Sequence, residues 1–233
     1  AIAEGLDSQT VDEVTLITAK EQLNLDEDAF IKYSKEGKVA VNSQAIKEEK
    51  VKEALEGMEK ITYCYNPFFD VTNSLASLWF AREEMDDDLI IMNADVFFTE
   101  EILTALLKDK RSPVMAIDRS RVQEGDYFFK TAWNGRIEKY GKGLPIELRS
   151  CEYVGMAKVE KSFLPLFKKR MEEMIRSQQH SAWWENVLYS FTDQKEQDIY
   201  TVDVDGKFWA EIDYFDDYER IIDYVAHTRE SRK

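Results

Sequence analysis

The first half of the chain alternates short apolar runs with stretches of helical periodicity. Residues 48–58 and 73–85 place apolar side chains on one helical face, and Thr99 followed by two glutamates predicts a further helix start. Apolar runs that end at turn residues predict buried strands at residues 11–19, 61–65, 89–98 and 113–118. Strands that alternate with helices in this way are typical of a parallel, doubly wound α/β sheet.

The pattern changes after Asp118. Strands are predicted at residues 127–130, 136–140 and 151–159, and Asn134-Gly135 between the first two is a strong hairpin signal. The remaining predicted elements are helices at 162–177 and 183–191, strands at 199–204 and 208–212, and a last helix at 215–229. We therefore expect a single domain over residues 1–233, with a small insertion at 20–44 and a β-rich portion at 119–160.

Two of the predicted strands lead into an aspartate. Asp95 follows the apolar residues 89–92 and Asn93-Ala94, and Asp213 follows the short strand 208–212. Ligands of open α/β sheets collect outside the carboxyl ends of strands, so both carboxylates are candidates for one site. Mg²⁺ prefers carboxylate oxygens and usually takes one or two from the protein, together with water and substrate phosphates. Capping of the helix that follows is the structural alternative for each aspartate.

Composition narrows the partners that the chain can have. Its 233 residues include 46 Asp and Glu and 31 Lys and Arg, for a formal net charge of −15 and a pI near 4.7. This charge argues against non-specific binding to nucleic acid or to an anionic membrane, whereas a bound Mg²⁺ would still admit a phosphate-bearing substrate. Cys64 and Cys151 lie in apolar runs, so we expect buried free thiols and a reducing cytoplasm. No apolar run approaches the ~18 residues of a membrane span.

Several short motifs, in their order along the chain, resemble those of the bacterial nucleotidyltransferases that make CDP-choline and CMP-phosphonates. Among them are Asn93-Ala94-Asp95, Trp184-Glu185-Asn186-Val187-Leu188 and Glu211-Ile212-Asp213. The other matching segments are residues 66–67, 72–78, 135–137, 139–142, 152–156 and 217–219. The resemblance covers residues 60–225 and depends on the order of the motifs rather than on any one of them.

The resemblance implies a Rossmann-like, three-layer α/β nucleotidyltransferase fold, with a mixed, mostly parallel sheet and a small β-rich portion that binds the acceptor. It also implies CTP as donor, Mg²⁺ as cofactor, and phosphocholine or 2-aminoethylphosphonate as the acceptor. In that family the aspartates that match Asp95 and Asp213 hold the metal. Residues 20–44 depart from the compact connection of the family, and we expect them to fold over the nucleotide.

The beginning of the chain also departs from the family. Its members start with a strand and a Gly-x-Gly-x-Arg loop, followed by a Pro-Lys pair, and this loop cradles the phosphates. Nothing before Val11 matches that loop, and residues 1–6 resemble the end of the helix that follows it. Two explanations stay open. The sequence lacks its natural beginning, which we expect because a sheet without its first strand would be open at its centre, or the chain is a homologue that has lost catalysis.

A carboxylate among tryptophans is suited to hold an ammonium group, through charge and cation–π attraction. Glu185, with Trp184 beside it, is therefore the candidate for the amine of the acceptor. Its structural alternative is a solvent-facing helical glutamate next to core tryptophans. Further aromatic residues that could complete a cage are Trp133, Tyr65, Phe68 and Phe69.

Polar and basic side chains complete the predicted site. Asn66, Asn73, Ser74 and Asn93 are candidates to bind the nucleotide or polar atoms of the acceptor. Lys130, Lys139 and Lys142 are candidates for the acceptor phosphate, with a surface position as the alternative for each. Lys142 lies between two glycines and is assigned a catalytic role together with Asp95 and Asp213.

The expected reaction is attack of the acceptor phosphate or phosphonate oxygen on the α-phosphorus of CTP, with release of pyrophosphate. One alternative is a sugar-1-phosphate nucleotidyltransferase or an NDP-sugar glycosyltransferase of the same fold class. The other is a non-catalytic ligand-binding homologue. In each case we expect a cytoplasmic protein without nucleic-acid or membrane partners, and a homodimer is compatible with this expectation.

Overall fold

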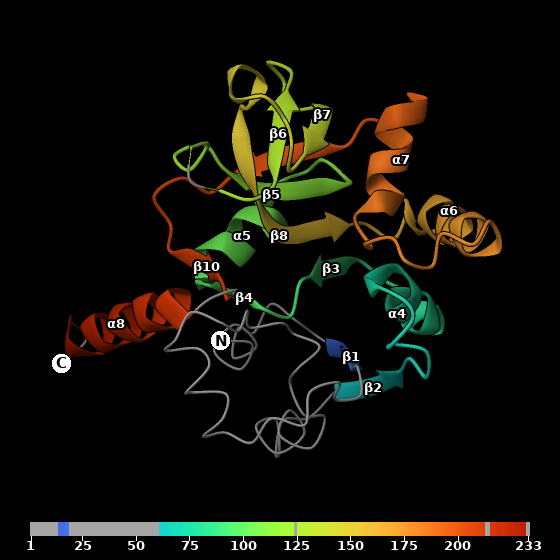
Figure 1. The fold of residues 1–233 in the computed structure, drawn as a ribbon, viewed down its shortest axis with the longest axis horizontal. Helices are drawn as coiled ribbons and strands as arrows, with labels where there is room; N and C mark the ends of the chain where they lie inside the picture. The colour runs from blue at the N-terminus through green and yellow to red at the C-terminus, as the bar shows by residue number, and fades with distance from the viewer. Residues whose placement is uncertain (1–13, 19–60, 124, 213–214, 232–233) are drawn as a thin grey trace.

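A computed structural model describes residues 14–18, 61–123, 125–212 and 215–231 (Figure 1). The helix predicted at 48–58, the insertion predicted at 20–44 and Asp213 lie outside these residues. Strands β1 (Val14–Thr18) and β2 (Ile61–Tyr65) form a parallel pair, in which Val14 lies opposite Ile61. Both of the strands that the sequence predicts in this part of the chain are therefore present.

The remaining elements follow the predicted order closely. Between β2 and the β-rich portion are α4 (Ser74–Phe80), the 3₁₀ turn η2 (Arg82–Glu84), β3 (Leu89–Met92), β4 (Val96–Phe98), α5 (Glu100–Lys108) and β5 (Val114–Asp118). The β-rich portion contains β6 (Phe128–Thr131), β7 (Ile137–Gly141), the 3₁₀ turn η3 (Ile146–Leu148) and β8 (Cys151–Val159). The chain then forms α6 (Leu164–Arg176), α7 (Asn186–Gln194), β9 (Tyr200–Asp203), β10 (Trp209–Glu211) and α8 (Phe215–Ser231).

The apolar run at residues 89–98 is two strands and not one, which corrects the sequence prediction. Strand β3 pairs with β8, whereas β4 pairs with β10 in a separate two-stranded sheet. The chain changes sheet at Asn93–Asp95. Apolar side chains continue on both sides of this turn, so only the long-range pairing with β8 and β10 reveals it.

The main sheet is mixed, as expected. Its order is β7-β6-β8-β5-β9, and β3 also pairs with β8. Strand β8 is antiparallel to β3, β5 and β6, and β9 is parallel to β5. Strands β3, β5, β6 and β9 therefore all run in one direction. Only β7 and β8 run in the other direction.

The β-rich portion curves back toward β9. Arg136, just before β7, forms an antiparallel bridge with Tyr200 at the start of β9. The N–H of Ile137 also donates to the carbonyl of Ile199 at 2.8 Å. The turn that makes this possible contains Gly135 at φ +82°, a left-handed conformation that favours glycine. These bonds link the β7 end of the strand order to its β9 end.

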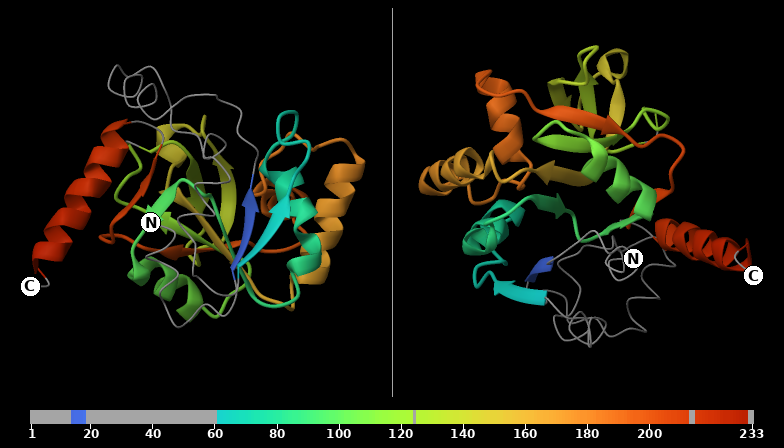
Figure 2. Two further views of the ribbon diagram at one scale, coloured as in Figure 1. Left: turned by 90° about the horizontal axis from the view of Figure 1, so that it is seen from below. Right: turned by 180° about the vertical axis from the view of Figure 1, so that it is seen from behind.

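Two hydrophobic cores cover the two faces of the sheet, which gives the predicted three layers (Figure 2). On β5, Met115 and Ile117 face α4, α6 and α7, whereas Val114 and Ala116 face α5. This alternation is the two-residue period of a strand. Figures 1 and 2 show α4, α6 and α7 grouped together, with α5 apart from them. The fold is therefore the Rossmann-like α/β arrangement that the sequence predicts.

A smaller apolar cluster attaches α8 to the β4–β10 pair. Phe208 stacks on Tyr224 with ring centroids 3.8 Å apart, and Phe97 meets both rings edge-on. Within the described ranges, none of the helices combines the length and the apolar character that a membrane span needs. Both cysteines are free, as expected; Cys151 is buried as predicted, whereas Cys64 is only half-buried, which corrects the prediction for that thiol.

Candidate active site

The turn between β3 and β4 holds the first predicted metal ligand. Asn93, Ala94 and Asp95 form this turn at the carboxyl end of β3, where α/β sheets bind ligands. The Asn93 N–H donates to the Gly155 carbonyl of β8 at 2.9 Å. Gly155 has φ +88°, and a Cβ there would lie 2.7 Å from Cγ2 of Val96. Glycine therefore lets the turn approach the sheet closely.

Strand β10 brings the second aspartate motif to the same turn. In its antiparallel pairing with β4, Glu211 lies opposite Val96. One residue further, the Ile212 N–H donates to the Asp95 carbonyl at 2.9 Å. The residue before Asp213 is therefore hydrogen-bonded to Asp95. Asp213 itself is outside the described part of the chain, and its role as a ligand stays a prediction.

The segment that leads into α7 packs onto the same turn. The indole N–H of Trp184 donates to the side-chain oxygen of Asn93 at 2.8 Å. The backbone N–H of Trp184 donates to the Ser74 hydroxyl at 3.0 Å. Trp184 is 3% exposed, so its ring belongs to the core. It acts by holding Asn93 and offers no open face to a ligand.

Glu185 is a buried carboxyl group beside this turn, with 6% of its surface exposed. Burial raises its pKa to about 7, the charge of Asp95 adds to the rise, and a hydrogen bond from the Asn93 side chain opposes it. A buried carboxylate is costly unless a cation or hydrogen-bond donors face it. The Asn93 amide is one such donor, and a role of Glu185 in binding a cationic ligand stays a prediction.

Tyr153 of β8 lies near both Glu185 and Glu211. Burial, followed by these two carboxylates, raises its pKa well above the usual range. Its hydroxyl is sealed from solvent and makes no hydrogen bond of ordinary geometry with the described residues, although it faces Glu185. Carboxylates from the start of α7 and from β10 thus converge on one tyrosine.

An aromatic group lies on the β6–β7 side of Glu185. Tyr127 stacks on Tyr189 with centroids 5.7 Å apart, and Tyr189 stacks on Tyr140 at 4.2 Å. Trp183 meets Tyr127 edge-on at 6.0 Å and is 41% exposed. Trp183 is therefore the member of this group that offers the most ring surface to a ligand.

Lys142 lies at the rim of the aromatic group. Its Nζ is 5.5 Å from the Trp183 ring centroid, within the range of a cation–π contact. It also forms an ion pair with Asp126. The structure thus places Lys142 close to the segment that contains Glu185, whereas its role toward the acceptor phosphate stays a prediction.

The predicted asparagines before α4 have clear structural roles. Asn66 is buried, donates to the hydroxyls of Thr72 and Ser77, and accepts from the Phe68 N–H. Asn73 is the N-cap of α4, and its own N–H donates to the His180 carbonyl at 2.9 Å. These bonds organise the β2–α4 loop and dock the segment before Trp184 on it.

Three predicted ligand residues lie away from the site. Lys130 and Lys139 are opposite each other on β6 and β7, one residue from the pair Phe129 and Tyr140 that faces Tyr189. Strand alternation therefore directs both lysines to the other face, where Lys130 pairs with Glu138 at 3.1 Å.

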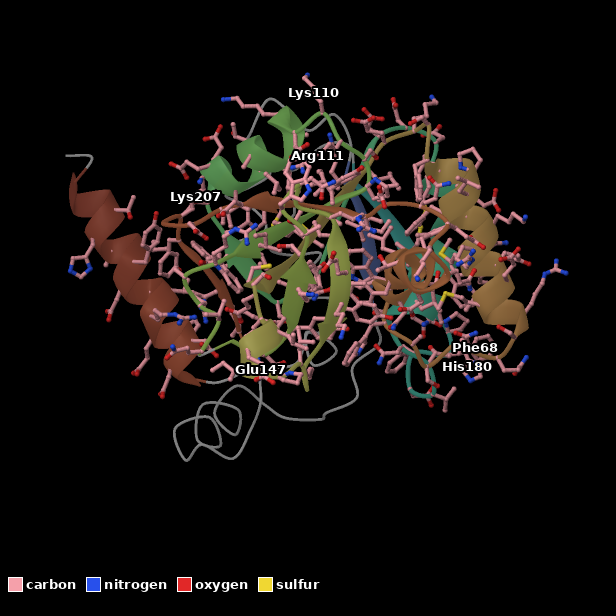
Figure 3. All side chains as sticks on the ribbon, turned by 90° about the horizontal axis from the view of Figure 1, so that it is seen from above. Phe68, Lys110, Arg111, Glu147, His180 and Lys207 are labelled. Carbon is pink, nitrogen blue, oxygen red and sulfur yellow. The ribbon has the colours of Figure 1, made fainter. Side chains whose placement is uncertain are left out.

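Trp133 is 99% exposed in the β6–β7 turn. This turn contacts Arg111, just before β5, through the Asn134 carbonyl at 2.9 Å. In Figure 3 Arg111 lies in the upper part of the molecule, below Lys110, whereas Phe68 and His180 lie at the lower right. The structure thus places Trp133 in a solvent-exposed turn next to the residue that precedes β5.

Asp95 is the one predicted metal ligand that the described residues contain. Among the described residues, no group of three or more His, Cys, Asp or Glu side chains has metal-site spacing. Mg²⁺ needs only one or two protein carboxylates, however, and Asp95 is one of the two predicted ligands. Its half-buried carboxylate is close enough to Glu185 to raise the pKa of that group, so the two side chains lie near one another.

Sequence reasoning did not single out Tyr153, Gly155 or Tyr127 as site residues. Tyr153 and Gly155 lie inside a matching motif, and a glycine and a tyrosine within the long apolar strand β8 were the available signal. The contact that explains Gly155 comes from Val96, far away in the sequence, and could not be read locally.

Comparisons with known proteins agree with the fold. No protein-family model and no curated protein matches the chain. Among solved structures, CTP:phosphocholine cytidylyltransferase from Streptococcus pneumoniae is similar, with a TM-score of 0.59 and 14% identity over 77% of this chain and 75% of that one. An inositol-1-phosphate CTP transferase from T. maritima has a TM-score of 0.57 and 17% identity over 72% and 66% of the two chains.

A third similar structure, from Bacillus anthracis, is described as a glucose-1-phosphate thymidylyltransferase, with a TM-score of 0.57, 12% identity, and coverage of 75% and 70%. At these identities the likeness defines the fold. The chain has the fold of nucleotidyltransferases that act on small phosphorylated molecules.

Proposed function

We propose that the protein is a nucleotidyltransferase that transfers a cytidylyl group from CTP to a small phosphorylated or phosphonylated amine and releases pyrophosphate. Phosphocholine and 2-aminoethylphosphonate are the acceptors that we propose. The fold supports the class, because the similar structures are cytidylyl- and thymidylyltransferases. The residues that converge on the β3–β4 turn support the choice of acceptor.

The observation that carries the proposal is the contact between Trp184 and Asn93. It places the buried carboxyl of Glu185 beside the turn that contains Asp95. A nucleotidyltransferase needs its acceptor and its metal-bound phosphates to meet at one point. The two motifs provide a carboxylate for each: Asp95 for the metal and Glu185 for the amine.

Glu185 would hold the ammonium group of the acceptor. The group is buried and has a raised pKa, so an incoming cation would stabilise its ionised form. Tyr127 and the exposed ring of Trp183 lie close to it and offer aromatic faces or edges to methyl groups on the nitrogen. Lys142, at the rim of this group, would face the phosphate or phosphonate.

Asp95, together with Asp213, would hold Mg²⁺, which neutralises charge on the phosphates of CTP when bound. The Asn93–Asp95 turn is fixed by its bonds to Gly155 and Ile212, so the carboxylate is positioned before substrate arrives. The acceptor oxygen then forms a bond to the α-phosphorus as the bond to pyrophosphate breaks.

A pyrophosphate-release assay with several acceptors tests the proposal. Full-length protein with CTP and Mg²⁺ should release pyrophosphate with phosphocholine or 2-aminoethylphosphonate. Glucose 1-phosphate and inositol 1-phosphate, which lack an amine, should give little release. Stimulation by a sugar or inositol phosphate and not by either amine would contradict the assignment of Glu185 and favour the sugar-phosphate alternative.

A further inference from the structure

Strand β10 is held by a very short pairing. It and β4 contribute three residues each to a two-stranded sheet that is separate from the main sheet. An isolated pair of this length is marginal by itself. A slip by one residue would move Glu211 to the other face of the strand, so an additional contact must fix the register.

A buried hydrogen bond connects β10 to the main sheet. The indole N–H of Trp209, at the start of β10, donates to Oδ2 of Asp118 at 2.9 Å. Trp209 is 4% exposed and Asp118 is 3% exposed. Asp118 is the last residue of β5, and its other oxygen accepts from the backbone N–H and hydroxyl of Ser120. The carboxylate is therefore fixed on both oxygens.

The ring of Trp209 is also fixed by a cation. The guanidinium of Arg121 lies 4.5 Å from the ring centroid, and its Nε pairs with Glu152 at 3.1 Å. Glu152 is buried and lies opposite Asp118 in the β5–β8 register. The main sheet thus supplies both the acceptor for the indole N–H and the anchor for the cation against its ring.

We propose that Trp209 and Asp118 are positioning residues whose hydrogen bond sets the register of β10 on β4. This register aligns Trp209 with Phe98 and Glu211 with Val96, and it brings the Ile212 N–H to the Asp95 carbonyl. Loss of the bond loosens the Ile212 contact and with it the segment that leads to Asp213. Its consequence for metal binding rests on the proposed function, whereas its consequence for the register does not.

Trp209→Phe is the direct test, because it keeps an aromatic ring and removes the N–H. The control is Trp79→Phe. The indole of Trp79 also donates to a carboxylate, Oε2 of Glu172 at 2.6 Å, and carries the guanidinium of Arg82 3.8 Å from its centroid, but it lies between α4 and α6. The two variants therefore lose the same kind of bond at different places.

The first measurement is hydrogen exchange of the Ile212 amide, compared with the Val204 amide, which donates to the Ile117 carbonyl in the main sheet. In Trp209→Phe, exchange of the Ile212 amide should accelerate at least about tenfold, while exchange of the Val204 amide stays within about twofold. Opening of the β4–β10 pair alone would expose Ile212 and leave the main sheet closed. Trp79→Phe should leave Ile212 unchanged. Unchanged exchange at Ile212, or equal acceleration at both amides, would overturn the proposal.

Asp118→Ala removes the same hydrogen bond from its acceptor side. This variant tests the proposal if Trp209→Phe does not fold. It should accelerate exchange at Ile212 as Trp209→Phe does, and the double variant should go no further, since both changes remove one interaction. Effects that add fully would contradict a shared role.

The second measurement is the Mg²⁺ concentration that gives half-maximal pyrophosphate release. It should rise about tenfold in Trp209→Phe, with KM for the acceptor within about twofold, as for other groups that orient metal ligands. An unchanged Mg²⁺ requirement would reject the link to metal binding. A wild-type protein without nucleotidyl transfer would reject the proposed function, and the exchange result would still decide the role of Trp209.

Discussion

The indole nitrogen of Trp184 lies 2.8 Å from the side-chain oxygen of Asn93 and donates a hydrogen bond to it across 91 positions of sequence. This bond joins the segment that starts α7 to the turn that ends β3. It uses the oxygen of the Asn93 amide and leaves the nitrogen to face Glu185. One asparagine therefore connects the proposed metal ligand Asp95 with the proposed amine ligand.

Removal of the Glu185 charge should weaken binding of the acceptor and leave binding of the nucleotide unchanged. In Glu185→Gln we expect KM for phosphocholine to rise at least about tenfold, because a charge-assisted contact to the ammonium is lost. KM for CTP should stay within about twofold. Steady-state kinetics with each substrate varied in turn measures both values. An equal rise of the two constants would point to a general disturbance of the fold.

Asp95→Asn should abolish turnover and leave the fold intact. The side chain is the proposed metal ligand, whereas the backbone carbonyl of Asp95 makes the bond to Ile212, so the β4–β10 register persists. We expect kcat to fall on the order of 100-fold or more, as for other groups that stabilise transition-state charge. Thermal unfolding should be near that of the wild type. The control is Asp86→Asn, which changes an exposed carboxylate before β3. Turnover like that of the wild type in Asp95→Asn would contradict the assignment of Asp95 as a metal ligand.

The buried Glu185 should make stability depend on pH. Its pKa rises from an ordinary 4.5 to about 7 in the folded protein, mainly through burial. Between these two pH values the folded state therefore keeps a proton that the unfolded state has released. The free energy of unfolding should therefore fall as pH increases from about 4.5 to 7, by on the order of 2 kcal/mol for this group. Urea denaturation at pH 5 and pH 8 measures the effect.

Glu185→Gln should lose this part of the slope and gain stability relative to the wild type at pH 8. Burial also raises the pKa of Glu152 to about 7, against the lowering effect of Arg121, so some slope should persist in the variant. A variant with the same pH dependence as the wild type would show that Glu185 does not titrate in this window.

Gly155→Ala should disturb the site through the new methyl group. Its Cβ would lie 2.7 Å from Val96 Cγ2 and 3.3 Å from Nδ2 of Asn93, in addition to the strain of φ +88°. Gly206, with φ +74° and no atom within 4 Å of an added Cβ, is the matched control because it has the strain without the contact. We expect Gly155→Ala to cost about 1–3 kcal/mol more than Gly206→Ala in urea denaturation. Equal costs would show that the β3–β4 turn can shift without loss.

The sequence predicts the layers of the fold because short apolar runs such as β5, bounded by turn residues and alternating with helices, are typical of strands buried on both faces. It does not predict the break at Asn93–Asp95, since Val96-Phe97-Phe98 continues the apolar run. That break depends on which strands the two halves pair with, and pairing between distant segments leaves no local pattern.

For the site, the structure brings two of the predicted carboxylates, Asp95 after β3 and Glu185 before α7, close to each other. The ligand roles of both stay predictions. Trp184 was expected to face the ligand, but the core and a hydrogen bond to Asn93 use its ring. Strand alternation relative to Tyr140 would have placed Lys130 and Lys139 on the outer face had the direction of Tyr140 been known.

The central claim is cytidylyl transfer to a phosphorylated or phosphonylated amine. Phosphorus NMR of full-length protein with CTP, phosphocholine and Mg²⁺ tests it most directly, because it resolves both products. The account predicts diphosphate signals of CDP-choline and a pyrophosphate signal that grow together in equal amounts, and that are absent with Asp95→Asn. A spectrum that retains only CTP and phosphocholine, with 2-aminoethylphosphonate also unconverted, would contradict it.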